Sequence, residues 1–255
     1  MPRKAATESV SDTHAAPGGA AAVDRALSLL AAFRTGDIAL SLAELAQRTR
    51  LYKSTVLRLL ASLEHARLIR RLEDGPHRGA YALGAEVARL HGLYRAAFSL
   101  EDVVMPVLRE LVAQTGESAA YHVLQGKPPH LSRLCLYRVD SPHPVRDHIR
   151  AGDVLPADRG TGARVLIAFG GHPTLGLSEK DRKMTAETRA RGYCTAIGDR
   201  LAEVAGISAP VFRSDGQGGQ SLAAALTLTM PAHRYDERFV KPVLEAARRL
   251  SASLG

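Results

Sequence analysis

The sequence of 255 residues contains no tryptophan, and all aromatic residues together make up only 5% of it. So few large rings argue weakly against a surface that stacks on sugars or on other rings. Two cysteines, Cys135 and Cys194, are too few for a disulfide framework. Hydrophobic residues at 45% and charged residues at 24% are ordinary proportions for a globular protein. At this length we expect one large domain or two modest ones, either with a core of its own.

Long apolar runs are also absent. The segment "LAAAL" at 222–226 is among the longest, and it is far below the length that spans a membrane. Residues 1–22, "MPRKAATESVSDTHAAPGGAAA", contain no apolar stretch long enough for a signal peptide. We therefore expect a cytoplasmic protein with no membrane partner.

Positive charge is in excess, and the net charge of the chain is +8. A single short segment, residues 48–71, carries a dense basic cluster and only one acid, Glu64. Such a cluster is the electrostatic footprint of a surface that binds phosphate groups. Its basic residues are Arg48, Arg50, Lys53, Arg58, Arg67, Arg70 and Arg71.

The first part of the chain changes from low complexity to helix. Residues 1–20 consist mainly of Ala, Gly, Ser, Thr and Pro with scattered charges, and we expect them to be a disordered tail. Beyond the tail, the apolar spacing predicts a helix over 23–34, with Leu27, Leu30 and Ala31 on its inner face.

A helix-turn-helix is predicted next. "SLAE" at 41–44 is a capping box that opens a short helix. After a tight turn, residues 52–65 place apolar side chains at i, i+3, i+4 and i+7, which predicts a second helix. The strand-like "LIRR" and "AYAL" then flank the turn segment "EDGPHRG". Together these elements predict a winged helix-turn-helix over 21–84, followed by a linker helix over 85–99.

From residue 100 onward, helical and strand patterns are mixed. The patterns predict an α+β domain over 100–255. Its expected helices cover 100–116, 162–169 and 234–254, and its expected strands lie within 118–139 and 207–230.

The second helix of the predicted helix-turn-helix, "LYKSTVLRLL" at 51–60, is the one that enters a DNA major groove. Its first amides, with the Ser54 and Thr55 hydroxyls, suit phosphate oxygens, and Arg58 one turn later is placed to reach guanine. A solvated, self-capped helix is the alternative. The capping box, the basic cluster and the hairpin together favour DNA. The predicted DNA-binding residues are Ser41, Arg50, Lys53, Ser54, Thr55, Arg58, Arg70, His77 and Arg78.

These segments carry a resemblance to a known family. The motifs "VDRALSLLAAF", "SLAELAQRTRLYKSTVLRLLASLEHARLIRR" and "YALGAEVARL" resemble the amino-terminal half of the IclR family of bacterial transcriptional regulators. The resemblance continues through "PVLRELVAQTGESA", "RAGDVLPADRGTGARVLIAF", "RARGYC", "AGISAPVF" and "LTLTMP", so it spans nearly the whole chain after residue 20. Each motif alone is loose, but the set in this order and spacing is specific.

The resemblance implies a dimer, or a dimer of dimers, whose winged helices bind a palindromic double-stranded operator. It also implies a carboxy-terminal domain similar to the GAF fold, which binds a small-molecule effector. Because one small DNA-binding unit has a limited interface, two units on adjacent half-sites supply the affinity that one lacks. The linker helix is expected to help set the half-site spacing and to transmit the effector signal.

The segment "ADRGTGARVL" at 157–166 is the best candidate for an effector pocket. Its glycines let backbone amides approach a ligand closely, and the helix that follows favours a carboxylate at its start. In members that sense organic acids, polar residues on later elements complete the pocket, and the resemblance maps these onto Asp199, Thr227 and Thr229. The predicted effector is an organic or aromatic acid, bound by Arg159, Gly160, Thr161, Gly162, Asp199, Thr227 and Thr229.

The chain departs from the family pattern near that pocket. Gly206 stands where many members carry cysteine, and Glu203 stands where glycine is usual. "PADRGT" at 156–161 replaces the common "PLHATA". The stretch at 169–193 is shorter than usual, which indicates that a helix or lid is missing there.

The alternative to a regulator is an enzyme or metal-dependent sensor with a nucleic-acid-binding appendage; another is a nonspecific nucleoid-type binder. No cysteine and histidine stand in a recognised catalytic motif, and H-x-x-x-H and C-x-x-C are both absent. His143 and His148, near two prolines, are a weak indication of zinc. We therefore expect no catalytic residues, no cofactor and no metal ligands.

Overall fold

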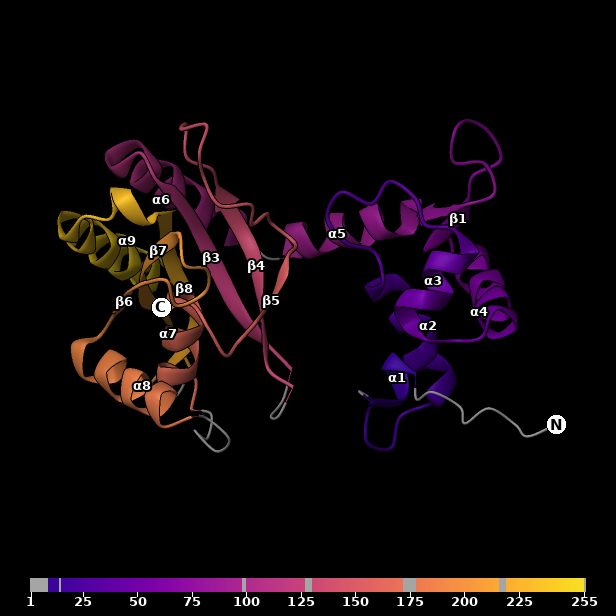
Figure 1. The fold of residues 1–255 in the computed structure, drawn as a ribbon, viewed down its shortest axis with the longest axis horizontal. Helices are drawn as coiled ribbons and strands as arrows, with labels where there is room; N and C mark the ends of the chain where they lie inside the picture. Colours follow the sequence, from indigo (N-terminus) through magenta and orange to yellow (C-terminus); the bar gives the residue numbers. More distant parts are fainter. Residues whose placement is uncertain are drawn as a thin grey trace. The chain divides into compact units, whose positions relative to one another are not determined.

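The structure is a computed structural model that describes residues 9–13, 15–97, 100–126, 130–171, 178–215 and 219–254. The chain divides into two compact units, Met1–Phe98 and Ser99–Gly255. Each unit is described by itself (Figure 1). No helix in the described ranges is both long and apolar enough to cross a membrane.

A single helical turn, α1 (Val10–Thr13), forms within the segment that was expected to be disordered. The Ser9 hydroxyl starts the turn, because it accepts from the Asp12 amide and donates to the Asp12 carboxylate. Asp12 in turn pairs with Arg25 at 3.1 Å, which ties the turn to the next helix. Residues 1–8 and 14 of the expected tail lie outside the described residues.

The first unit contains the predicted winged helix-turn-helix. Its helices are α2 (Ala21–Ala31), α3 (Leu42–Thr49), α4 (Lys53–His65) and α5 (Ala85–Ala97), and its strands are β1 (Ile69–Arg71) and β2 (Tyr81–Leu83). Ser41 and Glu44 form the predicted capping box at the start of α3. Arg50 ends α3 in the left-handed conformation, with φ of 57°, and this makes the tight turn into α4.

The inner face of α2 agrees with the prediction at Leu30, which packs against the core, and differs from it at Leu27 and Ala31. Leu27 is 54% exposed, whereas Leu29 is fully buried among Leu45, Val56 and Leu60 of the neighbouring helices. Both faces of α2 offer apolar residues at helical spacing, so periodicity alone could not choose between them. The choice is made by tertiary packing against α3 and α4.

Gly84 closes the wing where β2 ends. Its amide donates to the Leu68 carbonyl at 2.8 Å, and a Cβ at this position would lie 2.1 Å from the Arg67 carbonyl oxygen. We expect Gly84→Ala to lower the free energy of unfolding of the first unit by about 1–3 kcal/mol or more, because a backbone oxygen cannot move aside cheaply. Thermal or urea denaturation followed by far-UV circular dichroism measures the loss.

The matched control is Gly92→Ala. Gly92 lies within α5, and a Cβ there meets nothing within 4 Å. Alanine at that position is expected to leave stability unchanged or to raise it by up to about 1 kcal/mol. Equal effects of the two substitutions would contradict the close contact at Gly84.

The second unit is built on one antiparallel sheet of six strands in the order β5-β4-β3-β8-β7-β6. The strands are β3 (Ser118–Gln125), β4 (Ser132–Val139), β5 (Val154–Pro156), β6 (Cys194–Ile197), β7 (Val204–Ser214) and β8 (Gln220–Pro231). The helices are α6 (Leu100–Thr115), α7 (Thr161–Phe169), α8 (Glu179–Arg191) and α9 (Val240–Ser253), with short 3₁₀ turns at Ala232–Arg234 and Glu237–Phe239. Figure 1 shows α6 and α9 together, away from α7 and α8.

The two faces of this sheet differ in polarity. Because side chains alternate along a strand, Ile207, Leu226 and Leu228 join the core beneath α6 and α9. The residues next to them, Ser208 and Thr227, face α7 instead and are buried but polar. One face of the sheet therefore holds the main apolar core, and the other holds hydroxyl groups that are available for binding.

The stretch 169–193, which is shorter than the family's usual one, contains one helix, α8. It starts at a capping residue, Ser178, whose hydroxyl accepts from the Asp181 amide, and ends at Gly192 with φ of 79°. The buried residues of α8 are Thr185 and Thr188 rather than large apolar residues. A helix of this kind shows little apolar periodicity, which is why the sequence did not reveal it.

Candidate nucleic-acid interface and ligand cavity

Helix α4 presents a polar face beside its buried one. Val56, Leu60 and Leu63 are buried in the first unit. Ser54, Arg58 and Ser62 are exposed, as expected from their i, i+4 spacing. No side chain in the described ranges caps the first turn of α4, since its N-cap residue, Tyr52, makes no side-chain cap hydrogen bond. The amides at the start of α4 are thus available to donate hydrogen bonds to an anionic partner such as a DNA phosphate.

The remaining predicted DNA-binding residues lie around this helix. Lys53 is exposed and Thr55 is half-buried in the first turn of α4, while Arg50 is exposed in the turn before it. Arg70 is exposed on β1 of the wing. His77 and Arg78 are exposed in the connection between the wing strands.

One predicted DNA-binding residue, Ser41, and one residue of the basic segment, Arg48, are engaged in the fold. The Ser41 hydroxyl donates to the Glu44 carboxylate at 2.7 Å and accepts from the Glu44 amide, so it serves the capping box. Arg48 donates to the Ala32 carbonyl at 2.9 Å and pairs with Asp37. Because its guanidinium has partners within the unit, Arg48 contributes to packing more than to the exposed basic surface.

The second unit contains a cavity beside the start of α7. Gly160, Thr161, Asp199, Thr227 and Thr229 line it, all of them predicted effector-binding residues. Gly206, noted above as a departure from the family pattern, lines it too, and the lining residues that the sequence did not indicate are Arg133, Ile149, Ala196, Arg200, Val204 and Ala205. Its volume is about 20 Å³. A space of that size has room for about one water molecule.

Buried hydroxyl groups form one wall of the cavity. Ser208 Oγ lies 2.8 Å from Thr161 Oγ1 and 2.9 Å from Thr227 Oγ1, which links α7 to β7 and β8. The hydroxyl of Thr229 is buried and has no hydrogen-bond partner within the described structure. Because a buried hydroxyl is seldom left without a partner, this one is available to a ligand.

Asp199 organises the loop before α7. Its carboxylate accepts from the Gly160 amide at 2.7 Å and from the Arg164 guanidinium at 2.9 and 3.1 Å. Arg164, which is buried, also pairs with Asp181 of α8 at 2.7 Å. Asp199 and Asp181 thus share one guanidinium, and the role of Asp199 visible here is to hold the cavity wall.

Arg159 lies outside the cavity lining. Its side chain is exposed and makes two hydrogen bonds to the neighbouring Asp158, at 2.9 and 3.0 Å. Gly162 also does not line the cavity, but a Cβ at Gly162 would lie 2.8 Å from Thr227 Oγ1 and 3.0 Å from Arg133 Nη1. Glycine at 162 therefore keeps space for those two side chains.

Sequence reasoning missed two buried polar residues of this region. Arg133 is 3% exposed and His122 is 0% exposed. Burial, and then the charges of Arg133, Arg138 and Arg200, hold the pKa of His122 well below its usual range, so the imidazole is neutral. The available signal for Arg133 was its place near the start of the strand-like "SRLCLYRV", where alternation puts it on the same face as Cys135.

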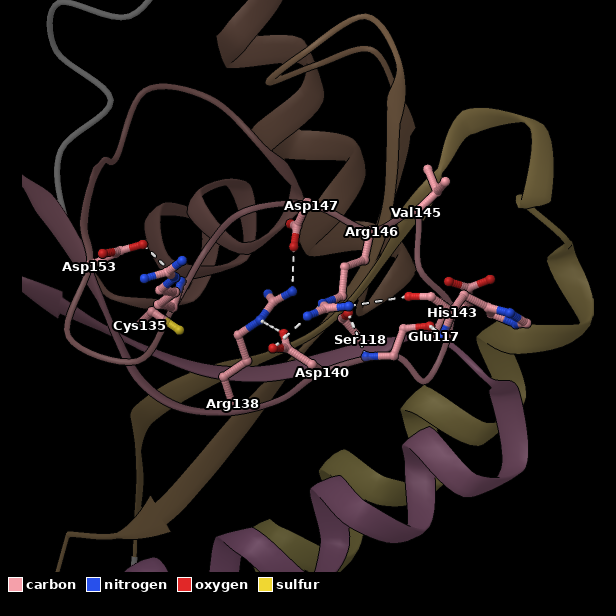
Figure 2. A network of polar contacts seen from close by, with 12 residues as sticks. Glu117, Ser118, Cys135, Arg138, Asp140, His143, Val145, Arg146, Asp147 and Asp153 are labelled. Atoms are coloured by element: carbon pink, nitrogen blue, oxygen red, sulfur yellow. Dashed lines mark hydrogen bonds and ion pairs between the residues drawn. The ribbon is translucent and has the colours of Figure 1, made fainter. Parts of the chain in front are cut away.

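A network of ion pairs joins β4 to the segment that follows it, and Figure 2 shows Arg138, Asp140, Arg146 and Asp147 of this network. Arg138 of β4 pairs with Asp147 and, at 2.7 Å, with Asp140. Asp147 also pairs with Arg200 of the cavity lining, at 3.3 Å. Arg146 joins the group through Asp140 at 3.6 Å. The segment 140–147 is thereby fixed to the sheet and to the cavity.

Three comparisons with known proteins agree with this arrangement. A family model described as the IclR helix-turn-helix domain matches residues 22–73. The transcriptional regulator TtgV of Pseudomonas putida is 31% identical over 189 residues, which cover 73% of this chain and 68% of TtgV. The chain belongs to the IclR family of transcriptional regulators.

Solved structures of the IclR family have the same fold. A putative IclR transcriptional regulator from Silicibacter sp. TM1040 has a TM-score of 0.73 and 26% identity, and the match covers 91% of this chain and 94% of that chain. An IclR homologue from Microbacterium hydrocarbonoxydans, solved in complex with 4-hydroxybenzoate, has a TM-score of 0.75 and 23% identity, with 91% and 98% covered. The predicted α+β class, with an N-terminal winged helix-turn-helix, is confirmed.

No side-chain group suited to catalysis stands out among the described residues. Burial raises the pKa of the Cys135 thiol to about 12, so that thiol is not a nucleophile at neutral pH. The described residues include no group of three or more His, Cys, Asp and Glu that could hold a metal ion. The relatives named here are transcriptional regulators rather than enzymes.

The departure from the IclR pattern at Gly206 has a structural reason. A Cβ at Gly206 would lie 2.6 Å from Thr161 Oγ1. The threonine at 161, where the family pattern has alanine, thus occupies space that a residue at 206 would need. The departures at positions 161 and 206 therefore depend on each other, because the two side chains would compete for the same space beside the cavity.

We expect Gly206→Cys to lower the free energy of unfolding of the second unit by about 1–3 kcal/mol, because the new side chain overlaps Thr161. Adding Thr161→Ala should recover a large part of that loss, with a coupling energy of about 0.5–3 kcal/mol. Urea denaturation of both single variants and the double variant measures the coupling. Strictly additive effects would show that the two positions do not compete for space.

Proposed function

We propose that the chain binds a palindromic operator as a dimer or dimer of dimers, and that a small organic acid modulates this binding. The exposed polar face of α4 carries the DNA-binding half of the proposal, with Ser54 and Arg58 beside an uncapped helix start. The basic turn and wing around it supply phosphate contacts. Such a protein acts where operator DNA is, in the bacterial cytoplasm.

The cavity beside α7 supports the effector half of the proposal. Its lining combines a helix start, hydroxyl groups and arginine side chains, which together suit a carboxylate. A structural neighbour has been solved with an aromatic acid, 4-hydroxybenzoate. With a volume of about 20 Å³, the cavity must open to admit such a ring. An acid that binds only an opened form shifts the equilibrium between two conformations of the second unit.

The proposal is tested by selecting operator sequences from fragmented genomic DNA of the source organism with the purified full-length protein. We expect one or a few inverted repeats, bound about a thousandfold or more tightly than random DNA at physiological salt. The affinity should fall steeply as salt rises, because bound phosphates release counterions. Adding organic acids one at a time to a gel-shift assay then identifies the effector.

Other outcomes of this experiment would point to the alternatives. Binding without sequence preference and without any ligand effect would indicate a nonspecific nucleoid-type binder. Turnover of a small molecule that continues after loss of DNA binding would indicate an enzyme with a nucleic-acid-binding appendage.

A further inference from the structure

Arg133 is a buried cation without a partner. It lies on β4, is 3% exposed, and its Nε has no hydrogen-bond partner within the described structure. None of the ion pairs recorded for the described residues involves it. Because a buried charge is normally paired, a free guanidinium at this depth calls for an anion.

The position of this guanidinium makes its isolation more costly. A Cβ at Gly162 would lie 3.0 Å from Arg133 Nη1, and a Cβ at Gly160 would lie 3.0 Å from Nη2, so the group spans the first turn of α7. Gly160, the N-cap residue of that turn, has no side chain to cap it, and its own amide donates to the Asp199 carboxylate at 2.7 Å. The start of a helix carries a partial positive charge, and a cation beside it is unfavourable. Unfavourable contacts of this kind are expected at functional sites, where a bound ligand can relieve them.

The other charged groups of the cavity already have partners. Asp199 is bound by Arg164 and by the Gly160 amide, and Arg200 pairs with Asp147. Burial and then the neighbouring charge of Arg200 lower the pKa of Arg133 to about 10. The guanidinium therefore still carries its charge at neutral pH. Among the described charged groups that line the cavity, Arg133 is the one without an ion pair or a hydrogen bond of its own.

We propose that Arg133 is the receptor for the effector's carboxylate, so that effectors of this chain are small acids held between the Arg133 guanidinium and the first turn of α7. The inference rests on the proposed function and names the recognition group of its effector site. The planar guanidinium and the first-turn amides supply several donors to the two oxygens of a carboxylate. The free hydroxyl of Thr229 is placed to accept or donate to a further polar group of the ligand.

The first test is the stability of the ligand-free protein with Arg133→Met. Methionine matches the unbranched part of the arginine side chain as far as Nε, and it lacks the charged end of the guanidinium. If the partner of Arg133 is a bound anion, the substitution removes an unpaired buried charge from the ligand-free protein. The melting temperature should then stay the same or rise. A fall of several degrees would show instead that the guanidinium supports the fold, and would overturn the proposal.

The second test is ligand binding by isothermal calorimetry. The probes are acetate, pyruvate and benzoate, each compared with its amide (acetamide, pyruvamide, benzamide), and inorganic phosphate. We expect at least one carboxylate to bind the wild type and its amide to fail. Arg133→Met should weaken that carboxylate by about 10- to 100-fold, as for the loss of a hydrogen-bonded charge. Arg133→Lys keeps the charge but loses the planar guanidinium. Its affinity for the carboxylate should lie between those of the wild type and Arg133→Met.

The matched control is Arg159→Met. Arg159 is close to the cavity in sequence, but it is exposed and paired with Asp158, so its removal should change neither stability nor binding. The proposal is overturned if no carboxylate binds the wild type, if the amides bind equally, if phosphate binds as tightly as any carboxylate, or if Arg133→Met binds unchanged.

Operator binding separates this inference from the proposed function. We expect Arg133→Met to bind the operator like the wild type and to lose the response to the acid. A variant that keeps both operator binding and the response overturns the role of Arg133 and leaves the regulator intact. A wild type that selects no operator refutes the proposed function, whatever the binding of acids shows.

Discussion

Asp147→Asn is expected to lower the free energy of unfolding of the second unit by about 3–5 kcal/mol, the cost of breaking a buried ion pair. The Asp147 side chain is 1% exposed and those of Arg138 and Arg200 are 3% and 13% exposed. Asparagine has nearly the same shape, so the substitution removes the charge without opening a cavity. Two guanidinium groups then lose a shared carboxylate in a region that already holds Arg133 without a partner.

Urea denaturation of the full chain, followed by far-UV circular dichroism, measures this loss. Asp158→Asn is the matched control, since Asp158 pairs with Arg159 at the surface and both side chains are more than half exposed. That exposed pair is expected to contribute less than about 1 kcal/mol. If the two variants lose the same small amount, the pairs made by Asp147 are screened by solvent and do not support the cavity.

The elements of the DNA-binding unit were predictable because their signals are local. The Ser41–Glu44 capping box, the turn at Arg50 and the apolar spacing of α4 all lie within about 25 residues of sequence. The choice of the buried face of α2 was not predictable in this way. Leu27 and Leu29 are both apolar, and only contacts with α3 and α4 decide which of them is buried.

The cavity was predictable only in part. Glycines before a helix indicated Gly160 and Thr161, and the resemblance to the IclR family indicated Asp199, Thr227 and Thr229; all five line it. Arg133 was not found, because an arginine in a strand resembles a surface residue until the neighbouring strands and α7 are known to cover it. Arg159 shows the reverse case, since it adjoins the glycines in sequence yet its side chain lies in solvent.

Arg58→Ala is expected to weaken operator binding by about 5- to 150-fold, the range for loss of a good contact to a base edge. Arg58 is exposed on α4, so the substitution should leave the melting temperature unchanged. Binding to random DNA should weaken much less, and specificity should relax at one position of each half-site. Lys53→Ala, at the first residue of α4, is expected to weaken operator and random DNA alike and to reduce the salt dependence by about one counterion.

Gel-shift titrations at several salt concentrations, with operator and random duplexes in parallel, separate these two roles. Arg182→Ala is the control, because Arg182 is an exposed arginine on α8 in the other unit and its loss changes the net charge by the same amount. If Arg58→Ala weakened both duplexes equally, Arg58 would contact phosphate rather than bases. Sequence recognition would then have to come from other exposed side chains of the same face, Ser54 and Ser62, or from the shape of the operator.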